Sequence, residues 1–243
     1  RLLQEFERAR QLGRRFVLGC PTGRTPRPTY ATLARRLSIA PQDLSHVLLV
    51  MMDEYLVEQS SGLEYASDQM PWSCRYIARA EILDQLNKSL PAEFALPQSS
   101  VWFPDASHPE AYDARIASAG GIDLFILASG ASDGHVAFNP PGSPRDSRTR
   151  IVALSEQTRR DNLQTFPAFG ALDSVPRHGV SVGITTITAA RNGVMLLTGE
   201  SKRESLSRVL KAERYDPQWP ATVIHEFTSG EILADRAAGA GLG

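Results

Sequence analysis

The sequence predicts a single α/β domain over residues 1–243, built on a doubly wound, mainly parallel sheet with helices on both faces. Short apolar runs recur along the chain and end abruptly at glycines or acidic residues, which is typical of strands buried on both faces. Helical patterns alternate with these runs, as βα units require. The chain has 243 residues, of which 42% are hydrophobic, and this is enough for one substantial core.

The first half of the chain is expected to alternate helices and strands. The sequence begins inside an amphipathic pattern that continues to Gly13, so we expect a short N-terminal piece, with a strand as one candidate, to be absent before Arg1. The elements predicted next are a strand over 16–20, a helix over 28–37, a strand over 46–52, a long polar loop over 56–73, and helices over 75–86 and 109–119.

The second half is expected to continue this alternation. The predicted elements are a central strand over 122–128, a strand over 150–154, a helix over 155–163, strands over 180–184 and 193–198 around a helical turn at 185–191, and closing strands over 222–227 and 231–234. The breaker-rich, aromatic segment 166–176 suits a lid or a packed surface loop equally well. The Ala/Gly-rich tail 237–243 is expected to be flexible.

Composition and charge exclude several classes of function. A net charge of −1 gives no general attraction for nucleic acid or an anionic membrane, so an anionic ligand needs a local cationic pocket. Two cysteines are too few for a disulfide framework, and the sequence has neither a signal peptide pattern nor an apolar run of about 18 residues. We therefore expect a cytoplasmic protein that binds a small molecule, while self-association stays open. The scattered histidines do not have the spacing of a metal site.

The central strand is followed by the most reactive segment of the sequence, Asp133-Gly134-His135. A histidine exchanges protons near neutral pH, and a neighbouring carboxylate can fix its tautomer. The alternative for this segment alone is an Asx-type turn with a solvated histidine.

The loop after the first predicted strand has the composition of a phosphate-binding loop. Thr22, Gly23, Arg24 and Thr25 lie between that strand and a helix start, where backbone N–H groups, hydroxyl groups and the helix dipole attract anions. The glycine spacing is that of neither a dinucleotide fingerprint nor a Walker loop. An ordinary strand-to-helix turn is the alternative interpretation.

Two further strand ends carry ionisable side chains. Asp53 and Glu54 follow the strand over 46–52, where a partly dry pocket would raise a carboxylate pKa towards the range of a general base. Lys202 lies at a helix start after the strand over 193–198. Taken singly, Asp53 and Glu54 also suit a helix cap or a solvated turn, and Lys202 also suits a solvated surface lysine. A parallel sheet brings all four strand ends to one edge, where a sugar phosphate fits them.

With these residues in place, the sequence resembles the glucosamine-6-phosphate deaminase/isomerase family, which shares its fold with the 6-phosphogluconolactonases. The resemblance covers most of the chain. The motifs that carry it are Gly19-Cys-Pro-Thr-Gly-Arg-Thr-Pro26, Met52-Asp-Glu-Tyr55, Gly121-Ile-Asp-Leu-Phe125, Asp133-Gly-His-Val-Ala-Phe-Asn139, Ser147-Arg-Thr-Arg150, Val175-Pro176 and the turn ending at Lys202.

The resemblance implies isomerisation of an amino-sugar phosphate to a ketose phosphate with release of ammonia, without a metal or an organic cofactor. It implies that Asp53 is the base that moves the proton between C1 and C2. It also implies that His135, held by Asp133, assists ring opening, while the loop 22–25 and Lys202 bind the phosphate.

The sequence departs from the deaminase pattern at several positions. Pro140 stands where the deaminases have a third, glutamate member of the histidine-centred group. A phosphate-binding arginine of the family falls at Gln164, and Arg159 or Arg160 are the candidates to replace it.

Two alternatives to the deaminase interpretation follow. One is a 6-phosphogluconolactonase-type hydrolase, which needs no glutamate at position 140. The other is a non-catalytic sugar-phosphate sensor, although the sequence shows neither a helix-turn-helix pattern nor a basic patch.

Overall fold

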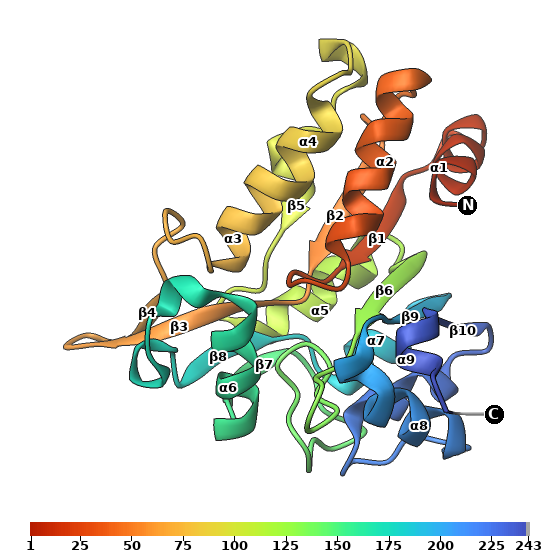
Figure 1. The fold of residues 1–243 in the computed structure, drawn as a ribbon. Helices are drawn as coiled ribbons and strands as arrows, with labels where there is room; N and C mark the ends of the chain where they lie inside the picture. Colours follow the sequence, from red (N-terminus) through yellow and green to blue (C-terminus); the bar gives the residue numbers. More distant parts are fainter. Residues whose placement is uncertain (242–243) are drawn as a thin grey trace.

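The computed structural model describes residues 1–241, in which helices flank a larger β-sheet and a smaller β-sheet lies beside it (Figure 1). The larger sheet contains β1 (Phe16–Cys20), β2 (Val47–Met51), β5 (Val101–Trp102), β6 (Leu124–Ala128), β9 (Gly193–Leu197) and β10 (Gly230–Ala234). Its strands are parallel and lie in the order β10-β9-β6-β1-β2-β5. The chain reverses the direction of winding between β1 and β6, and the predicted fold class is confirmed.

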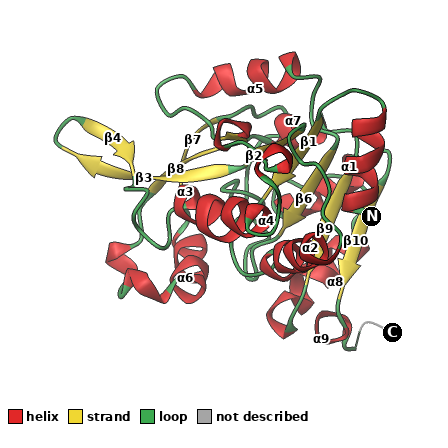
Figure 2. Cartoon of the chain, turned by 90° about the horizontal axis from the view of Figure 1, so that it is seen from above, coloured by secondary structure: helices red, strands yellow, loops and turns green. Residues whose placement is uncertain are grey.

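The smaller sheet is antiparallel, and the sequence pattern did not reveal it. It contains β3 (Asp53–Gln59), β4 (Gly62–Tyr65), β7 (Arg150–Ala153) and β8 (His178–Ser181), in the order β4-β3-β8-β7. Only Met52 separates β2 from β3, so the chain passes directly from one sheet to the other. The hairpin of β3 and β4 extends away from the rest of the molecule (Figure 2).

One face of the larger sheet is covered by the helices between Leu2 and Asn87. They are α1 (Leu2–Gln11), α2 (Arg27–Ile39) and a continuous helical stretch made of α3 (Cys74–Ile77), the π-helical turn η1 (Ala78–Leu83) and α4 (Asp84–Asn87). Phe6, Leu33 and Ile82 from these helices are buried against alternate residues of β1 and β2. This packing removes one side of each buried strand from water.

The opposite face is covered by α5 (Pro109–Ser118), α7 (Ile184–Thr188), α8 (Arg203–Lys211), the 3₁₀ helix η7 (Pro220–Glu226) and α9 (Arg236–Gly239). A third group of buried residues packs on the smaller sheet, next to α6 (Glu156–Thr165). The remaining elements are short 3₁₀ helices: η2 (Ala92–Phe94), η3 (Gln98–Ser100), η4 (Pro167–Phe169), η5 (Leu172–Ser174) and η6 (Glu200–Lys202).

Several expected elements differ from the structure. The polar loop predicted over 56–73 contains most of the β3–β4 hairpin, and the strands predicted near 150 and 180 belong to the antiparallel sheet. The closing strand predicted over 222–227 is helical, because Pro220 starts a buried 3₁₀ helix there. The tail predicted to be flexible begins in α9, whose Ala238 is buried, while residues 242–243 lie outside the described part.

The segment 166–176 is packed rather than open. Phe169 lies against Tyr55 and Trp72, with ring centroids 5.7 Å and 4.5 Å away.

No helix within residues 1–241 combines the length and hydropathy that a membrane span needs.

Candidate active site

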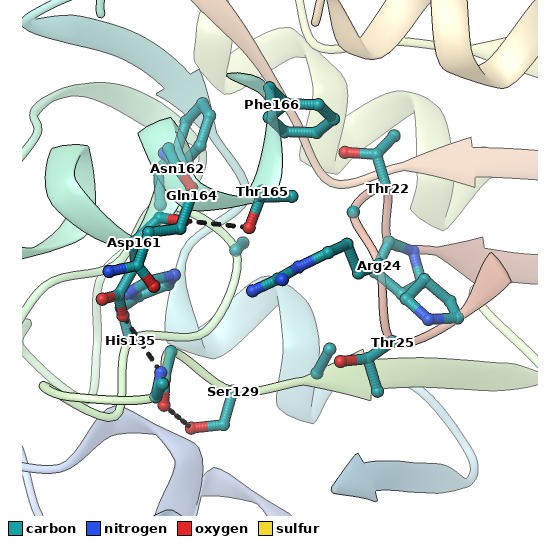
Figure 3. Close-up of a pocket in the computed structure, with 18 of the residues that line it drawn as sticks. Thr22, Arg24, Thr25, Ser129, His135, Asp161, Asn162, Gln164, Thr165 and Phe166 are labelled. Carbon is teal, nitrogen blue, oxygen red and sulfur yellow. Dashed lines mark hydrogen bonds between the residues drawn. The ribbon is translucent and has the colours of Figure 1, made fainter. Parts of the chain in front are cut away.

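A cavity of about 340 Å³ lies at the carboxyl edge of the larger sheet, between the ends of β1, β2, β6 and β9 and the helix α6 (Figure 3). Eight of the residues that the sequence singled out line it: Thr22, Gly23, Arg24, Thr25, Asp53, His135, Gln164 and Lys202. All of them except Gln164, which lies on α6, come together because parallel strands end at the same edge of a sheet.

Asp53 lies at the junction of the two sheets. It is the first residue of β3, and its backbone is in register with Ser181 of β8, which fixes where the side chain begins. The side chain is buried, with the residue only 6% exposed, and one carboxylate oxygen accepts a hydrogen bond from Cys74 Sγ at 3.3 Å. Burial raises the pKa of Asp53 to about 7, although the hydrogen bond from Cys74 acts in the opposite direction. A carboxylate with this pKa can accept and return a proton near neutral pH.

The Asp133–His135 pair is held by a network of hydrogen bonds. His135 Nδ1 lies 2.7 Å from Asp133 Oδ1, while Ser155 Oγ and Thr158 Oγ1 donate to Asp133 Oδ2 at 3.1 and 2.8 Å. Burial opposes the ionisation of Asp133, but the hydrogen bonds from His135 and Thr158 outweigh it and hold its pKa below the usual range. An ionised Asp133 fixes the proton of His135 on Nδ1, so Nε2 of the neutral imidazole is free to accept a proton.

Two glycines allow this segment to adopt its conformation. A Cβ atom at Gly130 would lie 2.2 Å from His135 Nδ1 and 2.5 Å from Asp133 Oδ1, so a side chain there would displace the pair. Gly134 has a φ of +66°, and its missing side chain makes room for the indole ring of Trp219. The close approach of the Gly130 backbone to the Asp133–His135 pair, and that of the Gly134 backbone to Trp219, therefore depend on glycine at both positions.

Two cationic side chains face the cavity. Lys202 Nζ donates a hydrogen bond to the Ser129 carbonyl oxygen at 2.5 Å. Burial lowers the pKa of Lys202, and the carboxylate of Asp161 counteracts this effect. Arg24 extends from the loop after β1 across the cavity towards α6 (Figure 3). Within residues 1–241, neither cation forms an ion pair with an acidic side chain, so both are available to an anionic ligand.

Helix α6 supplies the wall opposite the loop after β1. Asp161 on this helix accepts hydrogen bonds from the backbone N–H groups of Ala131 and Ser132 at 3.1 and 3.4 Å, which anchors the loop that leads to Asp133. Gln164 is one helical turn further on and also lines the cavity. Several lining residues were not predicted from the sequence: Cys74, Ser129, Asp161, Asn162, Thr165, Phe166 and Ser201. Asp161 lies three residues before Gln164, and this helical spacing is the signal that could have placed it on the same face of α6.

Glu54 does not face the cavity. Its carboxylate accepts hydrogen bonds from Ser73 Oγ at 2.8 Å and from the backbone N–H groups of Cys74 and Arg75 at 3.1 and 2.8 Å. Glu54 therefore caps the N-terminus of α3, where a carboxylate satisfies free N–H groups.

The two arginines considered as replacements at the phosphate site also lie elsewhere. Arg159 is buried and donates to the carbonyl oxygens of Val175 and Leu172 at 3.1 and 2.6 Å. Arg160 is exposed and pairs with Glu156 at 2.5 Å. Neither agrees with a role in phosphate binding, because both guanidinium groups are engaged outside the cavity.

One group of side chains in the described part of the chain has atoms close enough to hold a metal ion. Asp133, His135 and Asp161 each place an oxygen or nitrogen within 4.8 Å of the others. The same carboxylates already accept hydrogen bonds from His135 and the 131–132 backbone, and they interact electrostatically with Lys202. This arrangement suits proton transfer beside a cationic side chain, and the hypothesis that no metal or cofactor takes part stays a prediction.

Comparison with known proteins shows the family of the chain. A family model described as glucosamine-6-phosphate isomerases/6-phosphogluconolactonase matches residues 1–233. The chain belongs to this family. The glucosamine-6-phosphate deaminase of Shouchella clausii is 32% identical over 239 residues, which cover 96% of this chain and 88% of that protein. That of Streptomyces avermitilis is 36% identical over 232 residues, covering 95% of this chain and 84% of its own length.

Solved structures of family members have the same fold. A monomeric glucosamine-6-phosphate deaminase is 30% identical and superimposes with a TM-score of 0.75, covering 93% of this chain and 87% of that chain. The 6-phosphogluconolactonase of Thermotoga maritima is 20% identical with a TM-score of 0.61, covering 96% of this chain and 89% of that chain. The resemblance inferred from the sequence motifs is therefore confirmed.

Proposed function

We propose that this protein converts an amino-sugar 6-phosphate similar to glucosamine-6-phosphate into a ketose phosphate and ammonia. The observation that carries the proposal is the meeting of a buried carboxylate, a carboxylate-held histidine and two unpaired cations in one cavity. The deaminase relatives, at 32% and 36% identity over nearly the whole chain, support the same reaction.

The phosphate is expected to bind between the loop 22–25 and Lys202. Arg24 and Lys202 supply charge, and the loop 22–25 adds its own backbone N–H groups, since Pro26 and Pro28 supply none at the start of α2. Binding there would orient the sugar so that its reacting carbons lie towards Asp53 and His135. Holding the substrate in one orientation supplies a large part of the rate enhancement in reactions of this kind.

His135 is proposed to open the sugar ring by moving the C1 hydroxyl proton to the ring oxygen, with Asp133 stabilising the imidazolium. Asp53 then takes the C2 proton and returns it to C1, while a proton of the C2 ammonium group passes to the C1 oxygen, which changes the open-chain aldose into a C2 iminium. Water adds to that carbon, and ammonia leaves. Pro140, which replaces the glutamate of the deaminases, does not line the cavity, so His135 would act with Asp133 alone or with the nearby Asp161.

The decisive experiment follows hydrogen exchange at C2 of glucosamine-6-phosphate by NMR in deuterated water, together with ammonia release. The wild-type protein should catalyse both, and Asp53→Asn should lower both by about 10² to 10⁴-fold, the usual contribution of a general base. Asp173→Asn, an exposed position on η5, is the matched control and should behave like the wild type.

Absence of C2 exchange with every amino-sugar phosphate would contradict the proposal. Acid release from 6-phosphogluconolactone would then identify a lactonase, the reaction named for structural relatives at 14–20% identity. Binding of sugar phosphates without turnover of either substrate would identify a sensor. A cytoplasmic location and any self-association remain predictions from the sequence.

A further inference from the structure

A thiol lies directly behind the proposed base. Cys74 begins α3, is 2% exposed, and contributes to the cavity wall. Its Sγ is 3.3 Å from Asp53 Oδ1 and 3.4 Å from Thr22 Oγ1. The thiol therefore connects the phosphate-binding loop to the carboxylate.

The number of protons fixes the direction of these hydrogen bonds. An ionised Asp53 has no proton to donate, so the single proton of Cys74 must point to it. The Thr22 hydroxyl must then donate to the sulfur. Among residues 1–241, Cys74 is the one side chain that donates a hydrogen bond to the Asp53 carboxylate. Without this thiol, the carboxylate would be buried with no side-chain donor, which is an unfavourable state for a charge.

We propose that Cys74 is a positioning residue for this carboxylate, whose thiol favours the ionised form of Asp53 and directs it into the cavity. The inference rests on the proposed function of Asp53 as the base that moves the C2 proton. Cys74 does not touch the substrate's reacting atoms in this scheme; it acts through Asp53.

Other ionisable groups also face Asp53, and their effects on its pKa can be distinguished from the effect of the thiol. The carboxylate of Glu54 raises the pKa of Asp53 and the side chain of His135 lowers it, while Tyr55 and Tyr112 are buried nearby in neutral form. Substituting the Cys74 side chain leaves all four in place. It also leaves the Cys74 backbone N–H that donates to Glu54 at 3.1 Å, so the start of α3 keeps its cap.

The test measures the pKa of Asp53 directly, by NMR of the side-chain carboxyl carbon in the ligand-free protein, with the resonance assigned by its loss in Asp53→Asn. Cys74→Ala should raise this pKa by about 0.5 to 1, because a thiol is a weak donor. Cys74→Ser should return it to the wild-type value or below, because a hydroxyl group donates more strongly. If the alanine variant folds poorly, the serine variant alone decides: a pKa above that of the wild type contradicts the proposal.

Cys20→Ala is the matched control. Cys20 is also fully buried, but it lies within β1 and its Sγ contacts the Leu18 carbonyl oxygen at 3.7 Å instead of a cavity residue. This variant should leave the pKa of Asp53 unchanged. An equal rise of the Asp53 pKa in both alanine variants would indicate a general loosening of the core and would overturn the proposal. An unchanged Asp53 pKa in Cys74→Ala would overturn it too.

The dependence of kcat/KM on pH is the second readout. Its acidic limb should move to higher pH in Cys74→Ala by the same amount as the pKa, and return in Cys74→Ser. A fall in kcat/KM that is equal at every pH would show a purely structural effect and contradict the inference. If the wild type lacks activity on amino-sugar phosphates but the NMR shift is seen, the thiol contact stands and the proposed function fails.

Discussion

Replacing the proposed base should stabilise the protein at alkaline pH. Burial raises the pKa of Asp53 from its ordinary value of 3.8 to about 7, so the folded state keeps a proton that the unfolded state releases. The free energy of unfolding therefore decreases as pH rises through the window from about 3.8 to about 7. Each pKa unit corresponds to about 1.4 kcal/mol, and a difference of about 3 gives roughly 4 kcal/mol as an upper bound. Asn has a similar volume and is neutral at every pH.

Urea unfolding of the wild type and Asp53→Asn at pH 5 and pH 8.5 measures this effect. Between these values the stability of the variant relative to the wild type should increase by about 1 to 3 kcal/mol, less than the bound because pH 5 already lies inside the window between the two pKa values. Asp133→Asn is the matched substitution with the opposite sign. The pKa of Asp133 is depressed in the folded state, so its stabilising charge is present above pH 3.8, and the variant should lose stability equally at both pH values.

Two results would refute this reasoning. One is a difference between wild type and Asp53→Asn that does not change with pH, because the carboxylate would then titrate alike in both states. The other is an Asp53→Asn variant that is less stable than the wild type at pH 8.5. The first result would show that Asp53 is solvated or paired in the folded protein, and the second that the buried amide is less favourable than the ionised carboxylate.

Three further outcomes test the rest of the site. Lys202→Ala should weaken binding of 6-phosphorylated sugars by about 1 to 3 kcal/mol and leave binding of unphosphorylated sugars unaffected. Calorimetric titration measures both affinities, and equal losses for the two kinds of sugar would show that Lys202 does not bind the phosphate. Gly130→Ala places a methyl group 2.2 Å from His135 Nδ1, so turnover should fall by about 10²-fold while phosphate affinity is kept; wild-type turnover would contradict the fixed geometry. Thr158→Val removes a donor 2.8 Å from Asp133 and should lower the free energy of unfolding in urea by about 1.5 to 3 kcal/mol, whereas an unchanged value would show that the bond is not needed.

The parallel sheet could be predicted from the sequence, and the antiparallel sheet could not. The residues of β1 and β2 are apolar throughout, because both faces of each strand are buried. Glu58, Gln59 and Glu64 in the β3–β4 hairpin are solvent-exposed, so the hairpin has the composition of a polar loop. Conversely, the apolar segment after Pro220 is buried as a 3₁₀ helix, and a short apolar run alone does not distinguish that from a strand.

Residues at strand ends were accessible to sequence reasoning, and residues brought in by tertiary packing were not. Asp53, His135 and Lys202 each follow a recognisable strand, and the order of a parallel sheet places them at one edge. Cys74 reaches Asp53 because α3 packs against β3, and no periodicity in the sequence reports that contact. Asp161 reaches the cavity in the same indirect way, through the position of α6.

The cavity has walls from both sheets. The loop 22–25, His135 and Lys202 follow strands of the parallel sheet, whereas Asp53 begins a strand of the antiparallel sheet and α6 connects two others. A ligand that fills the cavity therefore contacts both sheets and holds them together. The chain itself joins them at Met52, the only residue between β2 and β3. At a concentration 100 times its Kd, such a ligand adds about 2.7 kcal/mol to the free energy of unfolding. Substrate supply would thus help to set the free energy of unfolding of the protein.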